Sequence, residues 1–249
     1  MSLNYQIWAD GPVDHESSNQ KSIKKHVGIH AVAKRPQQNQ YEIANEVVCL
    51  SLARRIDLPV PEGIVLELDS EYYFASLCVA KTAQKPPPAD TQWLAENLST
   101  QCTGGMVFDC WICNIDRHAE NIVHREATDD LYFIDHGDTL FTNAGEQYFA
   151  ERASDFALDY AESDLLLDAK NLEGLGDWVS RICEIPEKAI RRSVKLAIDY
   201  GVSEDCATCC ANFLIERRTR LLDWFLDKQS NREVFPNMTR GLFEGGHDD

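Results

Sequence analysis

The stretch that decides the fold is Phe108–Asp138, which reads FDCWICNIDRHAENIVHREATDDLYFIDHGD. Its first part is an apolar run with spacings of about three to four residues, and this periodicity predicts a helix. Two short apolar segments follow, separated by a Thr-Asp-Asp turn, and they predict two strands. Three polar side chains, those of Asp116, Asn121 and Asp135, lie at the ends of these elements. The sequence thus predicts an apolar helix and two apolar strands, with three polar side chains at the ends of these elements.

The order and spacing of these three residues indicate phosphoryl transfer. That reaction needs a carboxylate that orients the attacking hydroxyl, and side-chain oxygens that hold Mg²⁺ against the phosphates of ATP. Protein kinases place a catalytic Asp five residues before a metal-binding Asn, and a second metal-binding Asp after a strand. We therefore predict Asp116 as the catalytic base, and Asn121 and Asp135 as the metal ligands.

The pattern Asn-x-Asp-Arg-His-x-x-Asn at 114–121, followed by an apolar strand and Asp-His-Gly at 135–137, resembles the HipA-like kinase domain. That family belongs to the protein-kinase-like superfamily and is distantly related to phosphatidylinositol kinases. The resemblance covers roughly residues 30–150. It implies a two-lobed α+β fold, with a small β-rich N-terminal lobe and a larger helical C-terminal lobe. It also implies the use of ATP and Mg²⁺, and a Ser or Thr hydroxyl of a protein as the acceptor.

Two further site residues come from the N-terminal part of the chain. A predicted strand ends on Lys34, and the helix predicted over 42–56 carries Glu46. The Leu-Pro-Val-Pro sequence at 58–61 matches the ending of the corresponding family helix. The resemblance implies that Lys34 binds the α and β phosphates and that Glu46 pairs with it, with Glu42 as the alternative partner.

The sequence departs from the kinase pattern in one place, because no Gly-rich loop precedes Lys34. The best substitute contains Ser17 and Ser18, whose small side chains would let backbone N–H groups approach a phosphate. We expect the adenine to bind near 75–79, where the backbone between the two lobes is available.

The chain of 249 residues is long enough for two lobes. Two predicted strands flank a turn at 69–70, and a run of three prolines at 86–88 predicts a stiff connection after them. We therefore divide the chain into a first lobe over 1–85, a helical second lobe over 86–228, and a flexible tail over 229–249.

Charge excludes some partners. The formal net charge is −17, and residues 126–177 contain fourteen acidic side chains against two basic ones. A surface of this kind repels nucleic acid and anionic lipid headgroups. We therefore expect a nucleotide and a protein substrate as partners, and neither nucleic acid nor a membrane.

The cysteines and the N-terminus indicate a cytoplasmic protein. The nine cysteines are an odd number and lie mostly among apolar residues, which favours reduced, packed thiols over a disulfide framework. The N-terminal residues show no basic region followed by an apolar core, so we expect no secretory signal. No apolar run approaches the roughly 18 residues that a membrane span requires.

Other functions remain open for the same residues. Asp116 and Asn121 are also typical of caps in a turn, and Asp135 of a turn after a strand. A nucleotide-binding pseudokinase that acts as a scaffold is the main alternative, and the missing Gly-rich loop is its best support. Intact Asp116, Asn121 and Asp135 argue against it.

A metal-dependent hydrolase is the less favoured alternative. It would use His118, His124, Asp135 and His136, whose side chains are of the types that bind transition metals. The spacing of six positions between the first two histidines matches no common zinc pattern.

Overall fold

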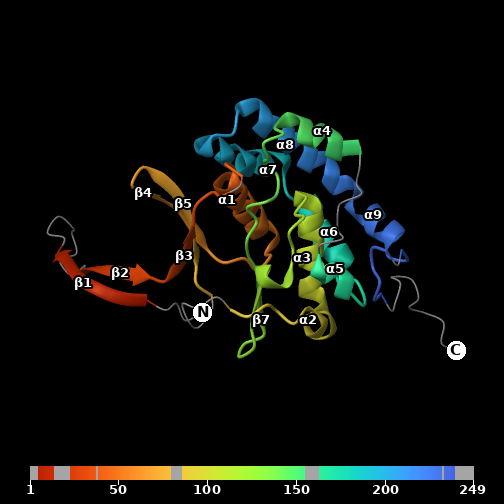
Figure 1. Ribbon diagram of the computed structural model, residues 1–249, viewed down its shortest axis with the longest axis horizontal. Coiled ribbons are helices and arrows are strands. Elements are labelled where there is room, and N and C mark those ends of the chain that lie inside the picture. The colour runs from red at the N-terminus through yellow and green to blue at the C-terminus, as the bar shows by residue number, and fades with distance from the viewer. Residues whose placement is uncertain are drawn as a thin grey trace.

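The computed structural model describes the chain over residues 5–13, 23–37, 39–79, 86–154, 163–231 and 233–238. Figure 1 shows most of the described strands in the N-terminal part of the chain and most of the helices in the rest. The chain therefore has an α+β fold with a small antiparallel sheet part and a larger helical part, as the sequence predicted. Ser17 and Ser18, the expected phosphate-binding residues, lie outside the described residues.

The described strands pair antiparallel in three small sheets. They are β1 (Tyr5–Val13), β2 (Ile23–Ile29), β3 (Ala31–Lys34), β4 (Gly63–Leu68), β5 (Glu71–Leu77), β6 (Ile122–Arg125) and β7 (Asp130–Phe133). The strand order is β1-β2 in the first sheet, β3-β5-β4 in the second and β6-β7 in the third. Asp69 and Ser70 join β4 to β5 with positive φ angles of 52° and 62°, which suit a tight two-residue hairpin turn.

The helices occupy most of the remaining described chain. They are α1 (Glu42–Ala53), η1 (Arg54–Ile56), α2 (Thr91–Asn97), α3 (Ser99–Ile112), η2 (Ala119–Asn121), α4 (Glu146–Ser154), α5 (Asp164–Asp168), α6 (Leu175–Cys183), α7 (Glu187–Lys195), η4 (Leu196–Tyr200), α8 (Glu204–Arg217), η5 (Arg218–Arg220) and α9 (Leu221–Lys228). The short elements labelled η are 3₁₀ helices. Ser203 caps the start of α8, because its side chain accepts a hydrogen bond from the Cys206 N–H.

α1 joins the sheet part to the helical part. It packs against β4 and β5, and also against α7 and η4 (Figure 1). Its Leu52 belongs to the same buried apolar cluster as Phe108 and Trp111 of α3 and Phe225 of α9. This shared core fixes α1, and therefore Glu46, relative to the helices that follow.

α3 lies close against β7, and this contact places the residue that follows the strand. A Cβ atom on Gly105 would lie 2.4 Å from the ring of Phe133, so a larger residue than glycine would push the strand away. Asp135 comes two positions after Phe133. The packing of α3 on β7 thus determines where Asp135 enters the site.

Part of the segment 229–249, which the sequence predicts as a flexible tail, packs against the helical part. Phe235 is completely buried and Met238 is 4% exposed. The Phe235 ring centroid lies 6.4 Å from that of Phe225, so this segment packs on α9. The apolar side chains of this short polar segment show neither helical nor strand periodicity. The contact of Phe235 with α9 therefore could not be predicted from the sequence. Residues 239–249 lie outside the described residues.

The thiols are reduced and mostly internal. All nine cysteines are free, and six of them are buried. Burial raises the pKa of the Cys102 thiol to about 12, as expected of a cysteine that serves as a small apolar core residue. Within the described residues, we find no helix with the length and apolar character that a membrane crossing requires.

Candidate active site

A cleft of about 600 Å³ lies where β3 and β5 face α1 and the segment around β6 and β7. Lys34, Glu46, Asn121 and Asp135 all line this cleft. The fold thus brings together four of the predicted site residues, which come from a strand, an α-helix, a 3₁₀ helix and a loop. The remaining described member of the predicted set, Asp116, is bonded to Asn121 at this cleft.

Asp116 and Asn121 form one unit in the loop before β6. The Asn121 amide nitrogen donates to the Asp116 carbonyl at 2.8 Å and to its carboxylate Oδ2 at 3.1 Å. His118 completes the group, with its Nε2 3.2 Å from the Asn121 amide nitrogen and 3.7 Å from Asp116 Oδ1. The Asp116 side chain is 44% exposed while Asn121 is buried. The carboxylate therefore has a defined position and remains open to an incoming group.

Asp135 pairs with Lys34 across the cleft. The distance from Lys34 Nζ to Asp135 Oδ2 is 2.5 Å. Asp135 has a φ angle of 61°, a left-handed conformation that Asp and Asn adopt more readily than other non-glycine residues. The sequence predicted Glu46 as the partner of Lys34, but the Glu46 carboxylate instead accepts a hydrogen bond from the backbone N–H of His136. The pairing of Lys34 therefore differs from the prediction.

The burial of Glu46 also changes its protonation. Burial, and next the Asp135 carboxylate, raise the pKa of Glu46 from 4.5 to about 7, while Lys34 acts in the opposite direction. Near neutral pH, Glu46 is therefore only partly ionised. A carboxyl in this state attracts the Lys34 ammonium less strongly than a fully ionised one would.

The raised pKa predicts how Glu46 affects stability with pH. The folded protein binds the Glu46 proton more tightly than the unfolded chain does, so its contribution is fully present below pH 4.5 and lost as pH rises through about 7. Relative to Glu46→Gln, the wild-type free energy of unfolding should therefore fall by at most about 3 kcal/mol between pH 4.5 and pH 8. Urea unfolding of both proteins at several pH values measures this, and parallel curves would contradict the environment described for Glu46.

One face of α1 holds the segment that follows Asp135. The buried Asn45 side chain donates to the carbonyl oxygens of Gly137 at 2.6 Å and Phe141 at 3.0 Å, and accepts from the Phe141 N–H at 2.8 Å. The neighbouring Glu46 accepts the N–H of His136. Sequence reasoning found Glu46 on this helix and missed Asn45, because a polar side chain on a helix shows its backbone partners only after folding.

Arg117 is the buried centre of the site. Its guanidinium donates to both oxygens of the Asp109 carboxylate, at 2.8 Å and 3.1 Å. The same group donates to the carbonyls of Asn121 at 2.6 Å and Ile134 at 2.7 Å. It thus joins α3 to the chain on both sides of β6 and β7. Sequence reasoning missed this pair, although an Asp within an apolar helix was a signal, since a buried carboxylate needs a partner.

Removing Arg117 should destabilise the protein strongly. Arg117→Met keeps an apolar stem but leaves Asp109 buried without its partner, which typically costs about 3–5 kcal/mol. Arg125→Met is a matched control, because Arg125 forms a partly exposed ion pair with Asp130 and such pairs contribute up to about 1 kcal/mol. Chemical unfolding of both variants measures the difference. Equal losses would show that Arg117 does not support the site in this way.

The histidines of the hydrolase hypothesis serve other contacts. His136 is buried with its Nε2 3.0 Å from Arg117 Nη2, and burial, Arg117 and Lys34 hold its pKa well below the usual value. His124 stacks on Trp93 with ring centroids 4.9 Å apart. Across the described ranges of the chain, we find no group of three or more His, Cys, Asp or Glu side chains suited to hold a metal ion.

Comparisons with known proteins bear on the family and the fold of the chain. A family model described as HipA-like kinase matches residues 24–188. The crystal structure of a Helicobacter pylori proinflammatory kinase, CtkA, matches with a TM-score of 0.53 and 14% identity, covering 78% of this chain and 91% of that chain. The Shewanella oneidensis MR-1 complex of HipA with HipB and its operator DNA matches with a TM-score of 0.41 and 11% identity, covering 82% of this chain and 61% of that one. No curated protein matches the sequence.

Proposed function

The chain belongs to the HipA-like kinase family, and from this premise we propose that it is an ATP- and Mg²⁺-dependent kinase that phosphorylates a Ser or Thr hydroxyl of a protein. The observation that carries the proposal is the convergence of Lys34, Glu46, Asn121 and Asp135 on one cleft, with Asp116 bonded to Asn121. A cation, two oxygen ligands and an exposed carboxylate are the groups that phosphoryl transfer requires.

The residues at the proposed metal position fit Mg²⁺. The hydrogen bonds of the Asn121 side chain use its amide nitrogen, and among the described residues its amide oxygen accepts none. This oxygen and the Asp135 carboxylate, both at the cleft, are hard ligands of the kind that Mg²⁺ prefers. When bound, Mg²⁺ would neutralise charge on the phosphates during transfer. Asn121 and Asp135 are the residues that would hold it.

Lys34 is proposed to bind phosphate oxygens of ATP. Its ammonium lies in the cleft and already contacts an anionic group, the Asp135 carboxylate. Glu46 lies close enough for its pKa to respond to Lys34, and it would hold the ammonium once Asp135 binds the metal. The two carboxylates thus offer Lys34 alternative partners.

Asp116 is proposed to act as the catalytic base. Asn121 orients one oxygen of its carboxylate, and the side chain is partly exposed beside the cleft. A hydroxyl entering from solvent can donate its hydrogen bond to this carboxylate and lose its proton to it as the phosphoryl group is transferred. The structure of the loop therefore suits both functions of a base, orientation and proton acceptance.

The adenine is proposed to bind against the end of β5. Ser76, Leu77, Cys78 and Val79 line the cleft there, so the backbone after β5 faces the space where a planar base would lie. Apolar side chains on both sides of a flat ligand are typical of nucleotide sites. We also propose a cytoplasmic location, because all nine cysteines are free thiols.

A nucleotide-binding scaffold without activity is the second candidate. One observation favours it. Lys34, the proposed phosphate-binding residue, pairs with Asp135, so in this conformation its ammonium contacts the carboxylate that would hold the metal. Tight nucleotide binding by the wild type, together with absence of transfer to any acceptor, would support the scaffold over the kinase.

A double-mutant cycle on Mg·ATP affinity tests the proposed nucleotide site. If Glu46 positions the ammonium, Lys34→Ala and Glu46→Ala should be non-additive, with a coupling of about 0.5–3 kcal/mol. Glu120 also lines the cleft, and a cycle of Lys34→Ala with Glu120→Ala supplies the control that should be close to additive. Calorimetry of the variants in each cycle gives the free energies. Strict additivity for Lys34 and Glu46 would show that they act independently.

A further inference from the structure

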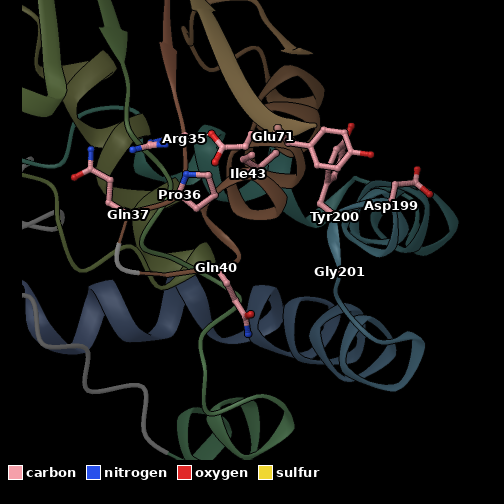
Figure 2. Close-up of a pocket in the computed structure, with 10 residues that line it drawn as sticks. Arg35, Pro36, Gln37, Gln40, Ile43, Glu71, Asp199, Tyr200 and Gly201 are labelled. Carbon is pink, nitrogen blue, oxygen red and sulfur yellow. Dashed lines mark hydrogen bonds and ion pairs between the residues drawn. The ribbon is translucent and has the colours of Figure 1, made fainter. Parts of the chain in front are cut away.

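A second cavity, of about 780 Å³, lies beside the nucleotide cleft at the N-terminal end of α1 (Figure 2). Three parts of the chain line it: the segment after β3, the start of β5, and the end of η4 with the turn that follows. None of the residues assigned above to nucleotide, metal or catalysis lines this cavity. The proposed kinase activity therefore does not account for this cavity.

One end of the cavity is aromatic. Tyr72 and Tyr200 contact each other edge to face, with ring centroids 5.8 Å apart and planes at 88°. Figure 2 shows Tyr200 and Asp199 toward one end of the cavity, with Arg35 and Gln37 at the other end. Tyr72 is 46% exposed, so part of its ring is open to a ligand. The faces of such rings attract cations.

The charges around the cavity favour a cationic ligand. Two carboxylates, Glu71 and Asp199, line the wall, and the single basic side chain, Arg35, lies 3.2 Å from Glu71 in an ion pair. Asp199 has no ion pair among the described residues, and it lies close enough to Tyr200 to help burial raise the pKa of that hydroxyl. The aromatic end therefore carries one uncompensated negative charge.

We propose that this cavity binds an arginine side chain presented by a peptide segment of a partner protein. A guanidinium is planar, so it can stack on a tyrosine ring while it donates hydrogen bonds to a carboxylate, which an ammonium cannot do equally well. The volume exceeds that of one side chain and leaves room for flanking residues. An acidic segment is disfavoured because Glu71 already neutralises Arg35.

A short loop connects the cavity to the proposed active site. Arg35 follows Lys34 directly, and the backbone N–H of Gln37 donates to both carboxylate oxygens of Glu42, the first residue of α1. The Gln40 side chain contacts that of Asn143 at 3.4 Å. A peptide bound here would lie against the loop that connects the proposed phosphate-binding residue to α1. The binding itself requires no nucleotide and no catalysis.

Fluorescence anisotropy with a labelled, arginine-containing peptide tests the proposal without nucleotide. The wild type should bind it saturably, and the same peptide with citrulline, which keeps the shape and loses the charge, should bind at least about threefold more weakly. Tyr72→Ala and Asp199→Asn should each weaken binding by about three- to tenfold. Tyr72→Phe keeps the ring and should bind as the wild type does. Glu216→Gln removes one exposed carboxylate that does not line the cavity, and should change little.

Arg35→Ala separates a cationic from an acidic ligand. Removing Arg35 releases the Glu71 carboxylate, so the arginine peptide should bind more tightly, by about threefold. A site for acidic or phosphorylated segments would instead prefer a matched glutamate peptide and lose it in this variant. Preference for glutamate, equal binding of citrulline, or unchanged binding in Asp199→Asn would each overturn the proposal. Thermal unfolding confirms that each variant is folded, and Tyr72→Phe, Asp199→Asn and Arg35→Ala decide the matter if Tyr72→Ala does not fold.

Discussion

Asp135→Asn should remove most of the dependence of ATP binding on Mg²⁺. Mutation of groups that only hydrogen-bond to metal ligands typically costs about 10–100-fold in metal affinity, so for loss of a ligand we expect Mg·ATP to bind at least about tenfold more weakly. Asn is a suitable replacement because it also tolerates the left-handed φ angle of 61° at this position. The backbone should therefore stay as it is while the charge is removed.

The same substitution should act oppositely on ATP without metal. Asp135 pairs with Lys34 and adds negative charge to the cleft, so its neutral replacement releases the ammonium and reduces repulsion of the phosphates. Calorimetry with ATP in EDTA should show equal or tighter binding by the variant. Asp138→Asn is the matched control, because Asp138 is an exposed carboxylate in the same electrostatic neighbourhood as Asp116 and Asp135. If ATP binding loses its dependence on Mg²⁺ in Asp138→Asn and keeps it in Asp135→Asn, then Asp138 is the metal ligand and Asp135 is not.

Asp116→Asn should slow phosphoryl transfer by about 10²–10⁴-fold, the usual contribution of a positioned general base. The replacement keeps an oxygen that can accept the hydrogen bond from Asn121 and removes the basic carboxylate. The side chain is 44% exposed, so the cost in stability should be small. Mg·ATP affinity should change little, because Asn121 and Asp135 are the proposed metal ligands.

Rate and affinity must be measured on the same Asp116→Asn preparation. Single-turnover transfer gives the chemical step, and calorimetry gives the affinity. A variant that transfers phosphate at the wild-type rate contradicts the base assignment. A variant that loses nucleotide affinity or folds poorly would show instead that Asp116 is a metal ligand or a structural cap.

The sequence was most informative where the site depends on local order. Asp116 and Asn121 lie five positions apart in one loop, and the structure joins them directly through two hydrogen bonds. Asp135 follows a short apolar strand and reaches the same cleft. Spacing within a loop and position after a strand are visible in a sequence, so this part of the geometry could be predicted.

The pairing of Lys34 could not be predicted, because it depends on burial. Lys34 and Asp135 are 101 positions apart, and burial raises the pKa of Glu46, the predicted partner, to about 7. Desolvation of a carboxyl arises only when the fold surrounds it. The contacts of Arg117 could not be predicted either, because they join Asp109 in α3 to the Ile134 carbonyl after β7.

Transfer of the γ-phosphoryl group from radiolabelled ATP tests the central claim most directly. The acceptors are the protein itself and the proteins of the source lysate, and each reaction is run with Mg²⁺, with EDTA, and with Asp135→Asn in place of the wild type. We predict labelled protein that is stable to denaturation with wild type and Mg²⁺, and little or none in the other two reactions. Nucleotide binding without labelled protein, or labelling that is the same in EDTA, would contradict the assignment of this cleft as the active site of a magnesium-dependent kinase.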